Sequence, residues 1–314
     1  MWYLAGTAAI LIFFLAVLYL IYYMAFQRNK MTILDDRTLP EGEQYEPHNE
    51  SILKSIERML PEPFEEVKIK ARDGIKLYAR LYQMYDDVPV ILFFHGYRSS
   101  SIRDGNGIFE LCKKHGYNIM MIDQRAHGKS EGKTITFGIC ERYDVLSWVS
   151  YAVEHFGKNT RIVLAGISMG ASTVLMASNL NLPKNVKGIM ADCPYSSPKD
   201  ILNCVMKSLK LPARLLYLLA KWSAKIYGRV DIEETSAKEA VTEAKVPILF
   251  IHGDDDRFVP CFMSEECCEA CASDKKLVFV KNAGHGISYC VDAKLYEKEV
   301  TEFMKRVCQA DDID

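Results

Sequence analysis

The sequence lacks an excess of charge of either sign. Its 39 lysines and arginines are balanced by 41 aspartates and glutamates, for a formal net charge of −2. A protein that binds nucleic acid usually carries a basic surface, so this composition gives no support for a nucleic-acid partner. With 314 residues, 49% of them hydrophobic, the chain can bury one substantial core and still carry an appendage.

The sequence also lacks an evident disulfide framework. Its ten cysteines are scattered singly, apart from a group at Cys261, Cys267, Cys268 and Cys271. Scattered cysteines are typical of a reducing compartment. Cys268 and Cys271 have a spacing that zinc sites use, but no second cysteine or histidine pair lies nearby. We therefore predict reduced helix cysteines, and neither a metal nor an organic cofactor.

Charged residues are missing from one long stretch, Trp2 to Phe26. Roughly 25 residues at about 1.5 Å per residue exceed the approximately 30 Å thickness of the bilayer hydrocarbon, which predicts a transmembrane anchor over residues 1–27. A cleavable signal peptide usually opens with basic residues, and this segment has none. Because Arg28, Lys30 and Arg37 follow the segment, we expect a single-pass protein whose following domain lies in the cytoplasm.

The rest of the chain divides into a linker and one domain. Residues 28–63 are polar and contain one possible short helix at 51–60, so we interpret them as a linker. Residues 64–314 alternate between strand and helix patterns. Two alternating segments flank Asp73-Gly74 as an antiparallel pair, and the continuous apolar run from Val88 to Phe94 is typical of a strand buried on both faces. This order predicts an α/β fold with a mostly parallel sheet flanked by helices, and sites at the carboxyl ends of its strands.

The alternation is interrupted at about 194–244 by a helical insertion. Its residues 209–227 carry leucines and Trp222 on one side and Lys221 and Lys225 on the other. An insertion at this point would cover a pocket as a lid, and a plain packed helix is the alternative.

The chemistry centres on Ser168, which stands between Gly166 and Gly170 at a junction of strand and helix. This G-x-S-x-G pattern is typical of a nucleophile elbow, where the glycines relieve crowding around a strained serine. A serine hydroxyl is a weak nucleophile and needs a base within hydrogen-bond reach. His285 is the best candidate among the seven histidines, since it follows a strand and lies between Gly284 and Gly286.

These motifs together resemble the α/β-hydrolase superfamily. Within it the chain is similar to the serine aminopeptidase and monoacylglycerol-lipase-like hydrolases that carry an N-terminal membrane anchor. The resemblance covers about residues 64–308 and implies an eight-stranded sheet with a small helical lid. It rests on ordered motifs that begin at His95, Asp123, Gly166, His252 and Gly284.

The resemblance also implies the remaining site residues. The family order of nucleophile, acid and histidine places the acid after His252-Gly253, where Val259-Pro260 sets the register on Asp256, with Asp255 as the alternative. Backbone N–H groups of Tyr97 and Met169 would form the oxyanion hole. Asp123 and Arg125 resemble a structural brace beneath the site.

We therefore expect a serine hydrolase that cleaves a carboxylic ester or amide through an acyl-enzyme intermediate. An esterase, a lipase and a peptidase all fit, with an ester, acyl or peptide substrate. The alternative is a catalytically silent, membrane-anchored protein of the same fold that binds a partner. The sequence gives no indication of the oligomeric state.

Overall fold

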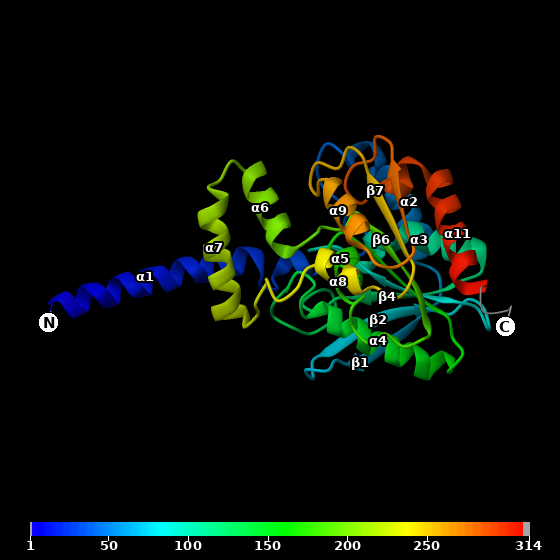
Figure 1. The fold of residues 1–314 in the computed structure, drawn as a ribbon, viewed down its shortest axis with the longest axis horizontal. Coiled ribbons are helices and arrows are strands. Elements are labelled where there is room, and N and C mark those ends of the chain that lie inside the picture. Colours follow the sequence, from blue (N-terminus) through cyan, green and yellow to red (C-terminus); the bar gives the residue numbers. More distant parts are fainter. Residues whose placement is uncertain (1, 310–314) are drawn as a thin grey trace.

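The computed structural model describes residues 2–309, as a long helix that projects from a body of strands and helices (Figure 1). The first residue of the predicted anchor and the last five residues of the predicted domain lie outside this range. The projecting helix is α1 (Trp2–Ala25), and it is the one described helix long and apolar enough to cross a membrane. Of its apolar 18-residue stretch only 6% is buried inside the structure, whereas the core helix of a soluble protein is mostly buried.

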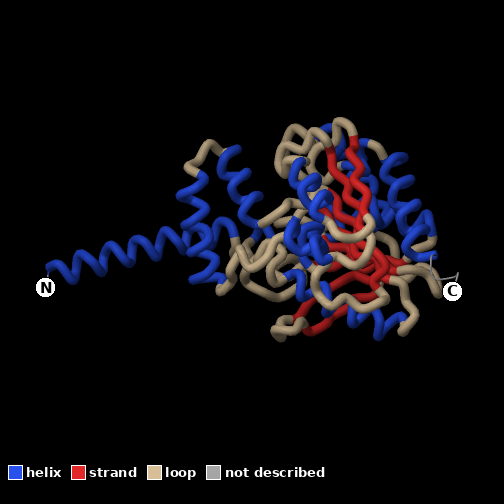
Figure 2. The backbone as a smooth tube through the Cα atoms, viewed as in Figure 1, coloured by secondary structure: helices blue, strands red, loops and turns tan. Residues whose placement is uncertain are grey.

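The body is built on the predicted sheet of eight strands, whose spatial order is β1-β2-β4-β3-β5-β6-β7-β8. Only β2 runs against its neighbours, so the prediction of a mostly parallel sheet is confirmed. Figure 2 shows the strands gathered in the centre of the body, with helices around them. The strands are β1 (Glu65–Lys70), β2 (Lys76–Tyr82), β3 (Val90–Phe94), β4 (Asn118–Asp123), β5 (Ile162–Ile167), β6 (Val186–Asp192), β7 (Ile248–Gly253) and β8 (Lys275–Val280).

Two apolar cores lie on the two faces of this sheet, because side chains alternate between faces along each strand. In β3, Leu92 and Phe94 join one core while Ile91 and Phe93 join the other. The first core is covered by α4 (Glu141–Phe156), α5 (Met169–Met176), α8 (Ala237–Ala240) and α9 (Phe262–Ala270). The second is covered by α2 (Asn49–Met59), α3 (Ser101–His115) and α11 (Ala293–Gln309), with the short α10 (Ser288–Val291) beside them.

The helical insertion consists of α6 (Pro198–Ser208), α7 (Ala213–Ser223) and a short π-helix, Ala224–Gly228, before α8. Helix α7 packs against α1, and Figure 1 shows it lying across that helix. The last turns of α1 enter the body, where Leu18 and Tyr22 are buried, as is Phe26 directly after the helix. The insertion is therefore attached to the foot of the projecting helix.

Candidate active site

Ser168 occupies the sharp turn between β5 and α5. Its backbone has φ 54° and ψ −115°, a conformation that a non-glycine residue adopts only when its surroundings enforce it. The close approach of neighbouring backbone explains the two flanking glycines. A Cβ at Gly166 would overlap the backbone of Gly170, and one at Gly170 would overlap the carbonyl oxygen of Phe94. The elbow can therefore form only with glycine at both positions.

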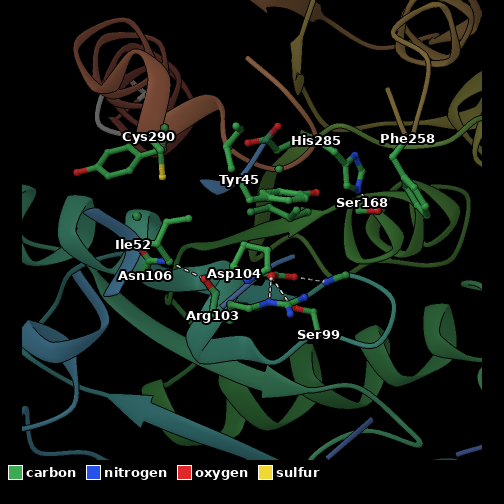
Figure 3. Close-up of a pocket in the computed structure, with 18 of the residues that line it drawn as sticks. Tyr45, Ile52, Ser99, Arg103, Asp104, Asn106, Ser168, Phe258, His285 and Cys290 are labelled. Carbon is green, nitrogen blue, oxygen red and sulfur yellow. Dashed lines mark hydrogen bonds and ion pairs between the residues drawn. The ribbon is translucent and has the colours of Figure 1, made fainter. Parts of the chain in front are cut away.

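The structure brings Ser168, His285 and Asp256 into one hydrogen-bonded chain. The Ser168 hydroxyl lies 2.9 Å from Nε2 of His285, and Nδ1 of His285 lies 2.7 Å from Oδ2 of Asp256. These residues follow β5, β8 and β7, so the carboxyl ends of parallel strands place them together. Figure 3 shows the Ser168 and His285 side chains beside each other at the edge of a cavity.

The two candidate acids have different surroundings. The Asp256 side chain is fully buried, and its Oδ1 accepts hydrogen bonds from the backbone N–H groups of Phe258 and Val259, each at 2.8 Å. Asp255 is 49% exposed and forms an ion pair with Arg257. Of the two aspartates, it is Asp256 that contacts His285.

Charge and burial oppose each other in the Asp256–His285 pair. Burial favours the neutral form of each group, but their mutual attraction outweighs it. Despite burial, the Asp256 carboxylate raises the pKa of His285 above its usual value. Burial alone would raise the pKa of Asp256, but the neighbouring His285 and His252 hold this pKa well below its usual range. The arrangement suits a histidine that accepts a proton beside a permanently ionised carboxylate.

His252 also contacts Asp256, a contact that the sequence interpretation did not assign to it. Its Nε2 lies 2.9 Å from the carbonyl oxygen of Val259 and 3.2 Å from Oδ2 of Asp256. Its Nδ1 lies 2.6 Å from the Ser264 hydroxyl, which fixes the ring. The only sequence signal was a histidine at the end of a strand, four residues before an aspartate.

The backbone N–H groups of Tyr97 and Met169 are both free to donate. Among residues 2–309 neither group has a hydrogen-bond acceptor. The flanking N–H groups are occupied: Gly96 donates to Asp104 Oδ2 at 2.7 Å, and Arg98 donates to His127 Nε2 at 3.1 Å. The loop after β3 is thus held on both sides of Tyr97, as a rigid donor site requires.

Asp123 and Arg125 both have structural partners. Arg125 forms two hydrogen bonds of 2.6 Å with Asp144, and Asp123 accepts from the backbone of Lys129 and from the Ser101 hydroxyl. They do not bond to each other. Each instead holds the loop after β4, where His127 supports the Tyr97 loop.

A cavity of about 460 Å³ opens at Ser168. Its walls include Tyr45 and Ile52, which belong to the segment predicted to be a linker (Figure 3). No described residue of the helical insertion lines it, which differs from the expected position of a lid over the mouth. Gln44 helps to fix this segment, because its Nε2 donates to the carbonyl oxygen of Asp255 at 2.6 Å. No pattern in residues 28–63 signals this contribution.

One group of possible metal ligands lies within the described residues, and it overlaps the hydrogen-bonded chain. It consists of Cys193, Asp256 and His285. Both ring nitrogens of His285 are already engaged, and burial raises the pKa of the Cys193 thiol well above its usual value, which disfavours the thiolate. The donor set therefore does not fit a metal ion. Cys268 and Cys271 belong to no such group among residues 2–309.

The known proteins that resemble this chain include hydrolases and esterases. Residues 87–239 match the family model described as serine aminopeptidase, S33. The chain is 28% identical over 221 residues to the protein YqkD of Bacillus subtilis, covering 70% of this chain and 72% of that one. It is 21% identical to the bifunctional esterase/perhydrolase DCH of Acinetobacter calcoaceticus, covering 76% of this chain and 99% of that protein.

A solved structure, the Pyrococcus furiosus esterase PF2001, is 26% identical to this chain. It superposes with a TM-score of 0.64, covering 80% of this chain and 93% of the esterase. Together with the sheet order and the match to the family model, this likeness confirms the predicted fold.

Proposed function

We propose that this protein, which has the α/β-hydrolase fold, is a serine hydrolase that works through an acyl-enzyme intermediate. The observation that carries the proposal is the chain of hydrogen bonds from Ser168 through His285 to Asp256. The similarity to an esterase and an esterase/perhydrolase supports a hydrolase and does not favour a catalytically silent binding protein.

In the proposed first step, the Ser168 hydroxyl attacks the substrate carbonyl while Nε2 of His285 accepts its proton. Asp256 keeps the His285 ring in the tautomer that presents an unprotonated Nε2, and it stabilises the imidazolium that forms. The imidazolium then protonates the departing alcohol or amine. Water attacks the acyl-enzyme in the second half, with His285 again as the base and Ser168 as the leaving group.

The negative oxygen that forms in both halves would be bound by the N–H groups of Tyr97 and Met169. An N–H held in place before the reaction stabilises this oxygen without reorganisation, and each such donor typically contributes about 2.7 to 4 kcal/mol to the transition state. The Met169 N–H also lies at the first turn of α5, where the helix dipole favours negative charge.

We propose an acyl ester as the preferred substrate class. The cavity contains several apolar side chains, among them Ile52, Ile108 and Phe258, which suit the acyl part of an ester. An aminopeptidase would need a free carboxylate near Ser168 for the substrate ammonium. Three acids line the cavity: Asp104 already binds the Gly96 N–H, Ser99 and Arg103, Asp192 accepts from the Ser288 hydroxyl, and Glu41 lies on the segment before α2. Rates on p-nitrophenyl esters of increasing acyl length, compared with aminoacyl anilides, decide between these substrates.

We also propose that α1 anchors the protein as a single transmembrane span with the hydrolase domain in the cytoplasm. The support is its length and apolar character, together with Arg28, Lys30 and Arg37 on the domain side. Protease treatment of intact cells tests the orientation. The hydrolase domain should survive until the membrane is permeabilised, and digestion in intact cells would place it outside.

The catalytic proposal is tested by pre-steady-state hydrolysis of a p-nitrophenyl ester. A burst of p-nitrophenol equal to the enzyme concentration is expected if the acyl-enzyme accumulates. Ser168→Ala should lose both the burst and the turnover while it keeps the melting temperature of the parent. Full ester hydrolysis by that variant would show that Ser168 is not the nucleophile.

A further inference from the structure

The insertion helix α7 turns a hydrophobic stripe outward rather than into the body. We call this the lid stripe, and its members are 43–57% exposed. The opposite side of α7 is covered, since Tyr217, Ala220 and Ser223 are buried. An exposed apolar stripe of this size on a helix marks a surface that another apolar phase covers. The lid stripe consists of Leu215, Leu218 and Trp222 of α7, together with Leu211 just before the helix and Ile226 in the π-helix that follows it.

The lid stripe is fixed at the foot of the projecting helix. The Ser223 hydroxyl donates to the carbonyl oxygen of Leu18 at 2.8 Å, and the Tyr227 hydroxyl donates to that of Leu15 at 2.9 Å. Figure 1 shows α7 running across α1, with the free part of α1 extending beyond it. If α1 crosses a bilayer, α7 therefore lies along the bilayer surface.

The free part of α1 is shorter than the whole helix. Leu15 already accepts a hydrogen bond from Tyr227 of the insertion, and Leu18 is fully buried, so of the described helix only residues 2–14 stand clear of the body. Thirteen residues at about 1.5 Å each give a length of about 20 Å. The hydrocarbon core of a bilayer is about 30 Å thick, so about 10 Å of it remains to be filled. Amphipathic helices at a membrane surface sink by about 5–10 Å, which matches this difference.

The charged residues within 207–229, the segment that carries the lid stripe, are all of one sign. Residues 207–229 contain six lysines and arginines and no aspartate or glutamate. Lys221 pairs with Glu233, while in the described part of the chain the other five form no ion pair. Basic side chains around an apolar stripe are the pattern that binds anionic lipid headgroups. The five are Lys207, Lys210, Arg214, Lys225 and Arg229.

We propose that the lid stripe is embedded in the bilayer leaflet at the foot of α1, with the five basic residues on anionic headgroups. The occupant of this surface is a lipid bilayer and not a second copy of the chain. The inference rests on the proposed membrane span of α1. It makes α7 a second membrane contact that fixes both the depth and the tilt of the hydrolase domain.

Trp222 is a natural reporter for this proposal, because the chain has only three tryptophans. The full-length Trp2→Phe variant is placed in liposomes of phosphatidylcholine and phosphatidylglycerol. It keeps two tryptophans, Trp222 and the buried Trp148. The matched control carries Trp222→Phe in addition. The emission difference between the two isolates Trp222. The emission of Trp222 should be blue-shifted, and phosphatidylcholine brominated at acyl carbons 6 and 7 should quench it strongly.

Two outcomes overturn the proposal. If the emission of Trp222 remains that of a water-exposed indole and is not quenched, the lid stripe does not enter the bilayer. A blue shift that depends on protein concentration, without quenching, assigns the surface to a second copy. Fluorophosphonate labelling of the same samples separates this test from that of the catalytic proposal. Labelling without quenching rejects only the embedding, and quenching without labelling rejects only the hydrolase.

Discussion

The Tyr97 hydroxyl donates a hydrogen bond to the carbonyl oxygen of Ala25, 2.9 Å away, and thereby joins the loop beside Ser168 to the last turn of α1. The neighbouring Arg98 guanidinium donates to the carbonyl oxygen of Met24 at 2.6 Å. The last carbonyl groups of a helix have no partner within the helix, so these two side chains cap α1. The residue whose backbone N–H is proposed to bind the oxyanion thus holds the projecting helix with its side chain.

Tyr97→Phe should expose this connection. The phenyl ring keeps its stacking on Phe137, 5.2 Å away between centroids, while the hydrogen bond to Ala25 is lost. We expect a loss of about 1 kcal/mol in the free energy of unfolding. We also expect a severalfold fall in kcat with little change in KM, because a looser loop weakens binding of the transition state and not of the substrate.

Tyr85→Phe is the matched control. Its hydroxyl also donates to a backbone carbonyl, that of Lys113 at 2.8 Å, but it is not part of the cavity wall. It should leave kcat unchanged. An equal kcat in Tyr97→Phe and the parent enzyme would mean that the loop does not depend on α1.

Asp256→Asn should reduce kcat by a factor on the order of 10⁴, because an amide no longer selects the reactive tautomer of His285. The pH profile should change as well. The base works only when neutral, and the Asp256 carboxylate raises the pKa of His285, so kcat/KM should rise with pH through that raised pKa. Without the carboxylate, burial lowers the pKa, and the rise should move to lower pH.

Asp255→Asn is the control for this prediction, since Asp255 pairs with Arg257 at the surface and does not contact His285. Its kcat and pH profile should match those of the parent enzyme. A greater loss in Asp255→Asn than in Asp256→Asn would reverse the assignment of the acid.

Gly170→Ala should prevent the elbow from forming. The added methyl group would overlap the carbonyl oxygens of Phe94, at the end of the central strand β3, and of His95, directly after it, and this backbone cannot move aside. We expect loss of the folded protein or a drop in melting temperature of more than about 10 °C. Gly6→Ala is the comparison, because a Cβ there meets nothing within 4 Å, and thermal melts in detergent should show no loss.

Tyr45→Ala should alter substrate choice. The Tyr45 side chain forms part of the cavity wall near Ser168, so its removal enlarges the space for the acyl group (Figure 3). The optimum among p-nitrophenyl esters should move to longer chains. An unchanged chain-length profile would indicate that the segment around Tyr45 does not bound the acyl site.

Strong local sequence patterns made the sheet and the turn at Ser168 predictable. The continuous apolar run of β3 and the paired glycines of the elbow each reflect a local steric requirement. The position of α7 and the wall formed by Tyr45 were not predictable, because both depend on long-range packing with no local signal. The outward lid stripe even reverses the usual expectation that the apolar side of a helix faces the core.

Covalent labelling with a fluorophosphonate, followed by mass spectrometry of the labelled peptide, tests the central claim most directly. The claim is that His285 and Asp256 activate Ser168 as a nucleophile. The account predicts one label per chain, located on Ser168 and lost in Ser168→Ala. Folded protein that takes up no label, or that carries the label on another residue, would contradict it.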